Sequence, residues 1–133
     1  MTAFVDTSAL LALLDADDEH HAEAKDVWHR LADAETPLVT TNYVVVETLA
    51  VAQHRLGMDA VRALVREIIP LIDVIFMGEA DHDAAVAALV AAGRRQLSLV
   101  DCASFLVMHH LHLHLAFTYD KQYAEQGFEM QVA

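Results

Sequence analysis

Apolar and β-branched residues gather in short runs that are separated by longer segments of mixed polarity. Runs of this length and composition, bounded by polar residues, Gly or Pro, predict β-strands. Five strands are predicted in this way: Thr2–Val5, Pro37–Thr41, Ile72–Met77, His114–Tyr119 and Phe128–Val132.

The longer segments carry apolar residues at spacings of three and four, which predict amphipathic helices. Helices are predicted for Ala9–Leu14, His20–Ala34, Asn42–Leu56, Asp59–Ile69, Ala80–Ala92 and Ser98–His110. Thr41 or Asn42 can cap the third of these helices, and Gly57, Pro70 and Gly93 supply stop signals. Strands that alternate with helices indicate an α/β fold: a single domain over residues 1–133 with a mostly parallel central sheet flanked by helices.

The overall charge narrows the range of functions. The 133 residues carry 8 Lys and Arg against 20 Asp and Glu, which gives a formal net charge of -12. Proteins that simply grip nucleic acid are usually basic, because contacts to phosphate dominate their affinity. The acidic balance instead suits a protein that collects divalent cations or binds a basic partner.

The cellular location is indicated by weaker signals. The sequence has no apolar run near the roughly 18–20 residues that a membrane span needs, so we expect no membrane association. The segment Met1–Asp6 lacks the basic and long apolar regions of a signal peptide, and none is expected. Cys102 is the single cysteine, so no internal disulfide can form and we expect a cytoplasmic protein.

Four acidic residues occupy unusual places in this pattern. Asp6 and Asp120 follow predicted strands, where open parallel sheets bind ligands. Glu47 and Asp101 lie within apolar helical stretches, and the nearest base that follows Glu47 on its helix, Arg55, is two turns away. A carboxylate in apolar surroundings is costly unless it is paired or bound to a metal. Four such acids without basic partners suit a hard cation such as Mg²⁺.

Helix capping is the alternative explanation of the three aspartates. Asp6 and Asp120 precede helical segments, and Ser98 with Asp101 fits the capping-box pattern Ser-x-x-Asp. Taken singly, each Asp is better explained as a cap than as a ligand. Glu47 lies in the middle of a helix, where capping cannot account for it. The combination therefore favours a metal site, and the aspartates can serve as caps as well.

Several segments together resemble the PIN-domain family, in particular its VapC-type members. Val5–Leu10 (VDTSAL) resembles the opening motif of that family, and His20–Ala24 (HHAEA) resembles its second-helix motif. Glu47, Leu97–Asp101 (LSLVD) and Thr118–Asp120 (TYD) resemble the remaining motifs in order. Each motif is weak alone, but the set spans nearly the whole chain.

This resemblance implies a ribonuclease that uses Mg²⁺ or Mn²⁺ and acts as the toxin of a type II toxin–antitoxin pair. The acidic quartet would be Asp6, Glu47, Asp101 and Asp120, catalytic and metal-binding at once. Thr7 or Ser8 would add a hydroxyl near the metal, and Ser98 or Thr118 would steady the acids. One or two ions would activate water for attack on an RNA phosphate. A small antitoxin with a basic segment would block the site. The identity of the RNA stays open.

Other protein classes fit less well. A receiver domain has paired acids after its first strand and a late lysine, and a haloacid-type phosphatase needs Asp-x-Asp where this chain has Asp6-Thr7-Ser8. A PIN fold that only binds, without catalysis, remains the alternative function. The histidine tract His109–His114 is better explained by surface or structural residues than by a zinc site, because such a site needs defined geometry.

The sequence also suggests how an acidic protein can meet RNA. The apolar helices at Val44–Leu56 and Val61–Ile69 offer more apolar surface than a small sheet can cover, so we expect a homodimer. A groove in this dimer would let Arg94, Arg95 and Lys121 guide RNA toward the acids.

Overall fold

One parallel sheet organises the computed structural model, which describes residues 1–131. Within this range the strands are β1 (Ala3–Val5), β2 (Leu38–Thr41), β3 (Asp73–Ile75), β4 (Leu115–Phe117) and β5 (Glu129–Met130). Their order across the sheet is β3-β2-β1-β4-β5, and every neighbouring pair is parallel. The predicted α/β fold is therefore confirmed. The end of the fifth predicted strand, at Val132, lies outside the described residues.

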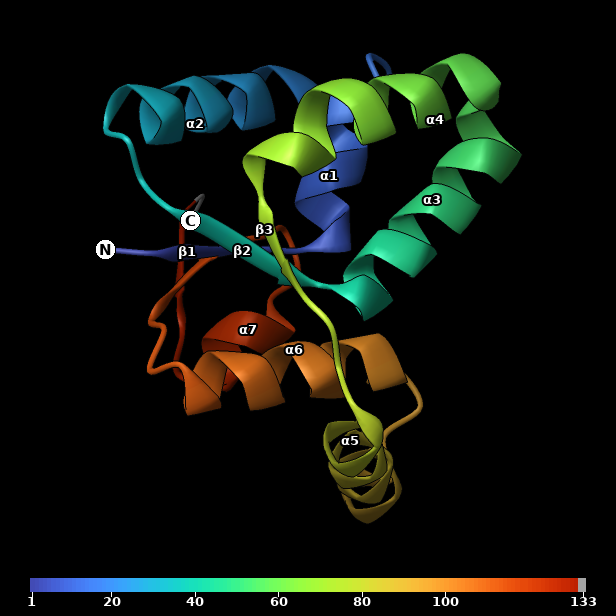
Figure 1. The fold of residues 1–133 in the computed structure, drawn as a ribbon, viewed down its shortest axis with the longest axis vertical. Coiled ribbons are helices and arrows are strands. Elements are labelled where there is room, and N and C mark those ends of the chain that lie inside the picture. The colour runs from blue at the N-terminus through green and yellow to red at the C-terminus, as the bar shows by residue number, and fades with distance from the viewer. Residues whose placement is uncertain (132–133) are drawn as a thin grey trace.

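Helices cover both faces of this sheet (Figure 1). They are α1 (Thr7–Leu14), α2 (His21–Asp33), α3 (Asn42–Leu56), α4 (Met58–Ala63), α5 (Glu79–Ala92), α6 (Leu99–His110) and α7 (Gln122–Glu125). In Figure 1, α1, α2 and α4 lie above the sheet, and α6 and α7 lie below it. The strand residues Phe4 and Phe117 are fully buried between these layers. No helix in residues 1–131 has the length and hydropathy that crossing a membrane requires.

Local signals set several helix ends where the sequence predicts them. The Thr41 hydroxyl accepts a hydrogen bond of 3.1 Å from the backbone N–H of Val44 and so caps α3. Gly57 follows the last turn of α3 with a φ of 90°, a conformation that a residue with a side chain rarely adopts. Both agree with the predicted start and stop of this helix.

The helix predicted over Asp59–Ile69 is present, but it is α-helical only in its first half. After α4 the chain widens into a π-helical turn, η1 (Leu64–Ile68), and tightens into a 3₁₀ turn, η2 (Ile69–Leu71). Pro70 explains the change, because it lacks an N–H and its ring clashes with the carbonyl four residues earlier in an α-helix. The N–H of Ile69 donates instead to the carbonyl of Leu64, five residues back, while the side chain of Leu64 stays fully buried.

Candidate active site

The carboxylate of Asp6 lies at the carboxyl end of β1, where it caps α1. Its Oδ2 accepts hydrogen bonds of 2.9 Å from the Ser8 hydroxyl and 2.9 Å from the Thr118 hydroxyl, and a longer one of 3.4 Å from the Ser8 N–H. Its Oδ1 accepts a 3.0 Å bond from the Tyr123 hydroxyl. Only 4% of the residue is exposed, and this burial raises the pKa of Asp6 against the opposing effect of the hydrogen bonds.

Strand register brings the β4 end of the chain to Asp6. Val5 on β1 pairs with Phe117 on β4, so the residues that follow them meet at the same sheet edge. The Ser8 hydroxyl accepts a 2.9 Å bond from the N–H of Tyr119, and the Thr118 hydroxyl accepts a 3.0 Å bond from the N–H of Asp120. These bonds lock the start of α1 to the loop that carries Asp120.

Asp101 occupies the first turn of α6 and forms the predicted capping box. The Ser98 hydroxyl accepts from the N–H of Asp101 at 3.0 Å, and the Asp101 carboxylate accepts from the N–H of Ser98 at 3.1 Å. Burial, to 9% exposure, is the main reason that the pKa of Asp101 rises to about 6. The negative charges of Asp6 and Asp120 raise it further, so these three acids share one electrostatic environment.

Asp120 is half-buried and precedes Lys121, the N-cap residue of α7, so it does not occupy the predicted cap position itself. Its carboxylate accepts a 2.9 Å bond from the backbone N–H of Gln122 and a 3.4 Å bond from the side-chain amide of the same residue, at the start of α7. The cap interpretation thus holds for Asp6 and Asp101, whereas Asp120 lies one residue before the N-cap of α7. It does not explain why Asp6 and Asp101 are buried, because an exposed carboxylate would cap a helix equally well.

Glu47 stands apart from the other three acids. It is half-buried on α3 and lines an open cavity together with Leu99 and Val100, the residues that precede Asp101. The adjacent Thr48 hydroxyl lies 3.3 Å from the Thr7 hydroxyl, which ties this part of α3 to the start of α1. Thr7 therefore faces α3, whereas Ser8 is the residue that contacts Asp6.

The four predicted acidic ligands can be compared with what Mg²⁺ or Mn²⁺ requires. Within residues 1–131, no three His, Cys, Asp or Glu side chains converge closely enough to ligate one ion. The ion pairs in that range also leave the four acids without a Lys, Arg or His partner. Mg²⁺ usually keeps several waters and takes one or two protein carboxylates, so buried acids without basic partners still fit it.

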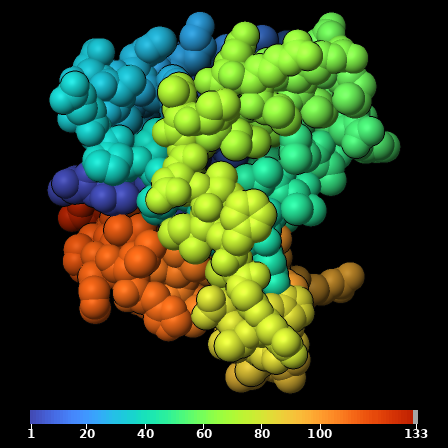
Figure 2. Space-filling view, in the orientation of Figure 1, coloured from blue at the N-terminus to red at the C-terminus, as the bar shows by residue number. Residues whose placement is uncertain are grey.

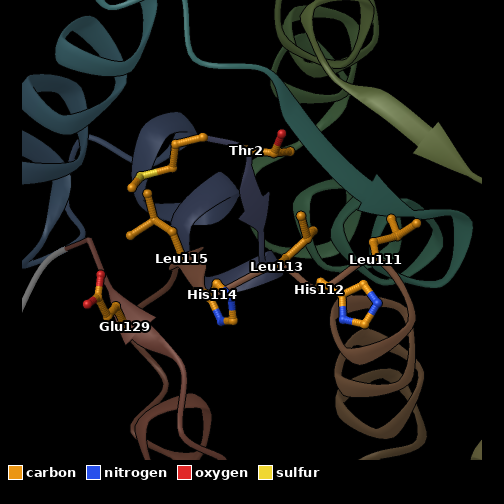
Figure 3. Close-up of a pocket in the computed structure, with 8 residues that line it drawn as sticks. Thr2, Leu111, His112, Leu113, His114, Leu115 and Glu129 are labelled. Atoms are coloured by element: carbon orange, nitrogen blue, oxygen red, sulfur yellow. The ribbon is translucent and has the colours of Figure 1, made fainter.

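His112 and His114 of the histidine tract lie at the opposite end of the strands from the acids. His112 and His114 precede β4 and line a cavity with Met1, Thr2 and Glu129, at the amino ends of the strands (Figure 3). The acids lie at the carboxyl ends, so the tract is separate from the candidate active site.

Sequence reasoning missed Tyr123. This residue of α7 is fully buried, and its hydroxyl donates to Asp6. Burial and the negative charge of Asp6 raise its pKa well above the usual value, so it stays a neutral donor. The signal that could have identified it is its position, three residues after Asp120 in the helical segment that follows that residue.

The sequence is similar to those of known proteins. The PIN domain family matches residues 3–129. The chain is 33% identical to the 23S rRNA-specific endonuclease VapC20 of Mycobacterium tuberculosis, with 94% of each chain covered, and 28% identical to its Ribonuclease VapC26, with 90% and 87% covered.

Solved structures agree as well. The crystal structure of M. tuberculosis VapC20, a sarcin–ricin loop cleaving toxin, superposes with a TM-score of 0.83 at 30% identity over 96% of this chain and 97% of that one. FitAcB from Neisseria gonorrhoeae shares the fold, with a TM-score of 0.65 at 15% identity over 97% and 96% of the chains. The chain therefore belongs to the PIN-domain family, in its VapC type.

Proposed function

We propose that this protein is a Mg²⁺- or Mn²⁺-dependent endoribonuclease, the toxin of a type II toxin–antitoxin pair. One observation carries the metal-dependent part. Asp6 and Asp120 meet at one end of the sheet, Asp101 shares their electrostatic environment, and no base pairs with the three within the described residues. The VapC ribonucleases to which the chain is related support the activity.

The ion would be held by Asp6, Asp101, Asp120 and Glu47 together with several waters, with one or two of these carboxylates in direct contact. When bound, such an ion lowers the pKa of a water molecule and stabilises negative charge on the phosphate. The chain itself orients Asp6 through three hydroxyl groups, those of Ser8, Thr118 and Tyr123. Because these donors fix the carboxylate before any ligand arrives, little reorganisation is needed during the reaction.

The approach of RNA to an acidic protein needs local positive charge. Arg94 pairs with Glu125 of α7 at 3.3 Å, and the side chain of Gln122 donates to the carbonyl of Gln96 at 3.2 Å. The loop that carries Arg94 and Arg95 therefore lies against α7, close to Lys121 and the acids. We propose that these three bases guide RNA into the site.

The partners and location follow from this assignment. An antitoxin with a basic segment would complement the net charge of -12 and block the acids. The protein would work in the cytoplasm, where its RNA substrate and antitoxin are found. Because the VapC20 relative is named for cleavage of 23S rRNA, a ribosomal RNA loop is the first substrate to test.

The test is cleavage of a ribosomal RNA fragment that contains the sarcin–ricin loop. We expect the parent to cut with Mg²⁺ or Mn²⁺ and EDTA to abolish cutting. Asp6→Asn and Asp101→Asn should each lower the rate by orders of magnitude, because both remove a charge that the metal needs. Asp26→Asn, at an exposed position on α2, is the matched control and should retain activity. Undiminished cutting by both site variants would disprove the assignment, and RNA binding without any cutting would favour the scaffold alternative.

A further inference from the structure

A cavity beside the acids has no role in the function described so far. It has a volume of about 340 Å³ and lies where α3, α5 and the start of α6 meet. Tyr43, Val46 and Glu47 line it from α3, and His82 lines it from α5. Leu99 and Val100 of α6 complete the wall.

Two aromatic rings meet in this cavity from separate helices. The Tyr43 hydroxyl is hydrogen-bonded to Nδ1 of His82, 39 residues later in the chain. The ring centroids are 5.8 Å apart and the planes cross at 66°, an edge-on arrangement. Tyr43 is half-buried and His82 is exposed, so the pair presents aromatic surface to solvent. Nearby Val46 is 66% exposed, which is costly for an apolar side chain without a ligand.

The cavity adjoins the candidate active site through Glu47 and the start of α6. Glu47 belongs to both, and Leu99 and Val100 immediately precede Asp101. A ligand that presents a phosphate to the acids would therefore place its neighbouring group in the cavity. In RNA that group is a nucleobase, which has an apolar aromatic face. Ligand pockets start at about 300 Å³, so this volume accommodates one base.

We propose that Tyr43, His82 and Val46 form a subsite that stacks one unpaired nucleobase next to the cleaved phosphate. The proposal rests on the ribonuclease function given above and adds residues that position the substrate. Aromatic side chains are the common platform for unstacked RNA bases. Because this platform reads the face of a base, it favours RNA that is unpaired at the cleavage point.

The first experiment measures cleavage of a short single-stranded RNA by Tyr43→Ala, Tyr43→Phe and His82→Ala. We expect Tyr43→Ala to lower kcat/KM by roughly 5- to 150-fold, the range that corresponds to the loss of one stacked base. Tyr43→Phe should recover most of the loss, because it keeps the ring. His82→Ala should have a smaller effect, and His29→Ala, at an exposed position on α2, should have none.

A substrate that lacks one base separates stacking from a general structural defect. With an abasic nucleotide next to the cut, parent and Tyr43→Ala should cleave at the same rate, because neither has a base to stack. Equal rates of the two proteins on intact RNA would overturn the proposal, as would a defect that persists on the abasic RNA. Thermal melts confirm that each variant is folded.

The outcomes also distinguish failure of the base subsite from failure of the proposed ribonuclease function. If the parent cleaves no RNA with any divalent ion, the proposed function fails. If it cleaves but Tyr43→Ala is unchanged, only the subsite fails. Should Tyr43→Ala convert a dimer to a monomer without changing RNA cleavage, the cavity is a contact between two copies of the chain, and the subsite is disproved.

Discussion

Asp6 accepts four hydrogen bonds at a position where 4% of the residue is exposed. Hydrogen bonds stabilise its ionised form, but burial acts more strongly in the opposite direction. Asp101 is in the same situation, with two capping hydrogen bonds and a raised pKa. Both residues therefore cost free energy when they are charged and unpaired. A bound cation would offset this cost, which links the candidate site to stability.

Asp101→Asn tests this link through the pH dependence of unfolding. The folded-state pKa of about 6 exceeds the ordinary aspartate pKa of 3.8, so the native state binds more protons between these pH values. Its contribution to stability is therefore lost as pH rises through this window and stays absent above it. In EDTA at pH 8, we expect Asp101→Asn to melt at a higher temperature than the parent, with a free energy of unfolding that is larger by on the order of 1–3 kcal/mol.

Metal addition gives the second half of this prediction. Mn²⁺ binds the folded site and so raises the melting temperature of the parent by mass action. Asp101→Asn should show a smaller rise, because one ligand charge is gone. If Asp101 acts only as a cap, the variant should instead be less stable in EDTA, with an unchanged Mn²⁺ shift.

At the scale of elements, local signals account for what the sequence predicted well. Thr41 starts α3 and Gly57 ends it, and Ser98 starts α6. These three residues act through contacts with residues only a few positions away. Signals of this kind are readable without a structure. The turn η1 was not predicted. Its hydrogen bonds depend on Pro70 and also on the burial of Leu64 in the core, and the burial cannot be seen in a local pattern.

The site was predictable to a similar degree. Asp6 and Asp120 follow strands, so parallel pairing is enough to bring them to one edge. The placement of Glu47 depends on how α3 packs, which no short-range pattern specifies. The contact of Tyr123 with Asp6 spans 117 positions and depends on the seating of α7, a helix of four residues.

Tyr123→Phe tests how far α7 depends on this contact. The change removes the 3.0 Å hydrogen bond to Asp6 and leaves a buried carboxylate oxygen without that donor. Hydrogen bonds to charged groups contribute about 1.5–3 kcal/mol, so urea unfolding should show a loss of this size. Activity should also fall, because Asp6 loses a group that orients it.

Tyr119→Phe is the matched control for this substitution. The Tyr119 hydroxyl is buried without a hydrogen-bond partner in the described part of the chain, so its removal should be neutral or stabilising. Equal destabilisation by both changes would show that ring packing, and not the bond to Asp6, is affected.

At the scale of the whole molecule, several large apolar residues remain exposed along the segment 58–76. Met58, Val65, Leu71 and Phe76 are 46%, 47%, 63% and 77% exposed. They belong to residues 58–76, which are coloured green to yellow and cross the visible face in Figure 2. This segment includes the predicted interface helix Val61–Ile69. We call it the 58–76 surface and predict that it joins two copies of the chain.

Val65→Asp tests the predicted homodimer. A charge at the centre of an apolar interface is left without water or a partner, so association should weaken strongly. Light scattering at about 10–50 µM, a range suited to an interface of standard size, should give the mass of a dimer for the parent and of a monomer for the variant. Val90→Asp is the matched control, because Val90 is 74% exposed on α5, outside the 58–76 surface, and should leave the dimer intact. A monomeric parent would contradict the homodimer itself. A dimer that survives Val65→Asp but not Val90→Asp would move the interface to α5.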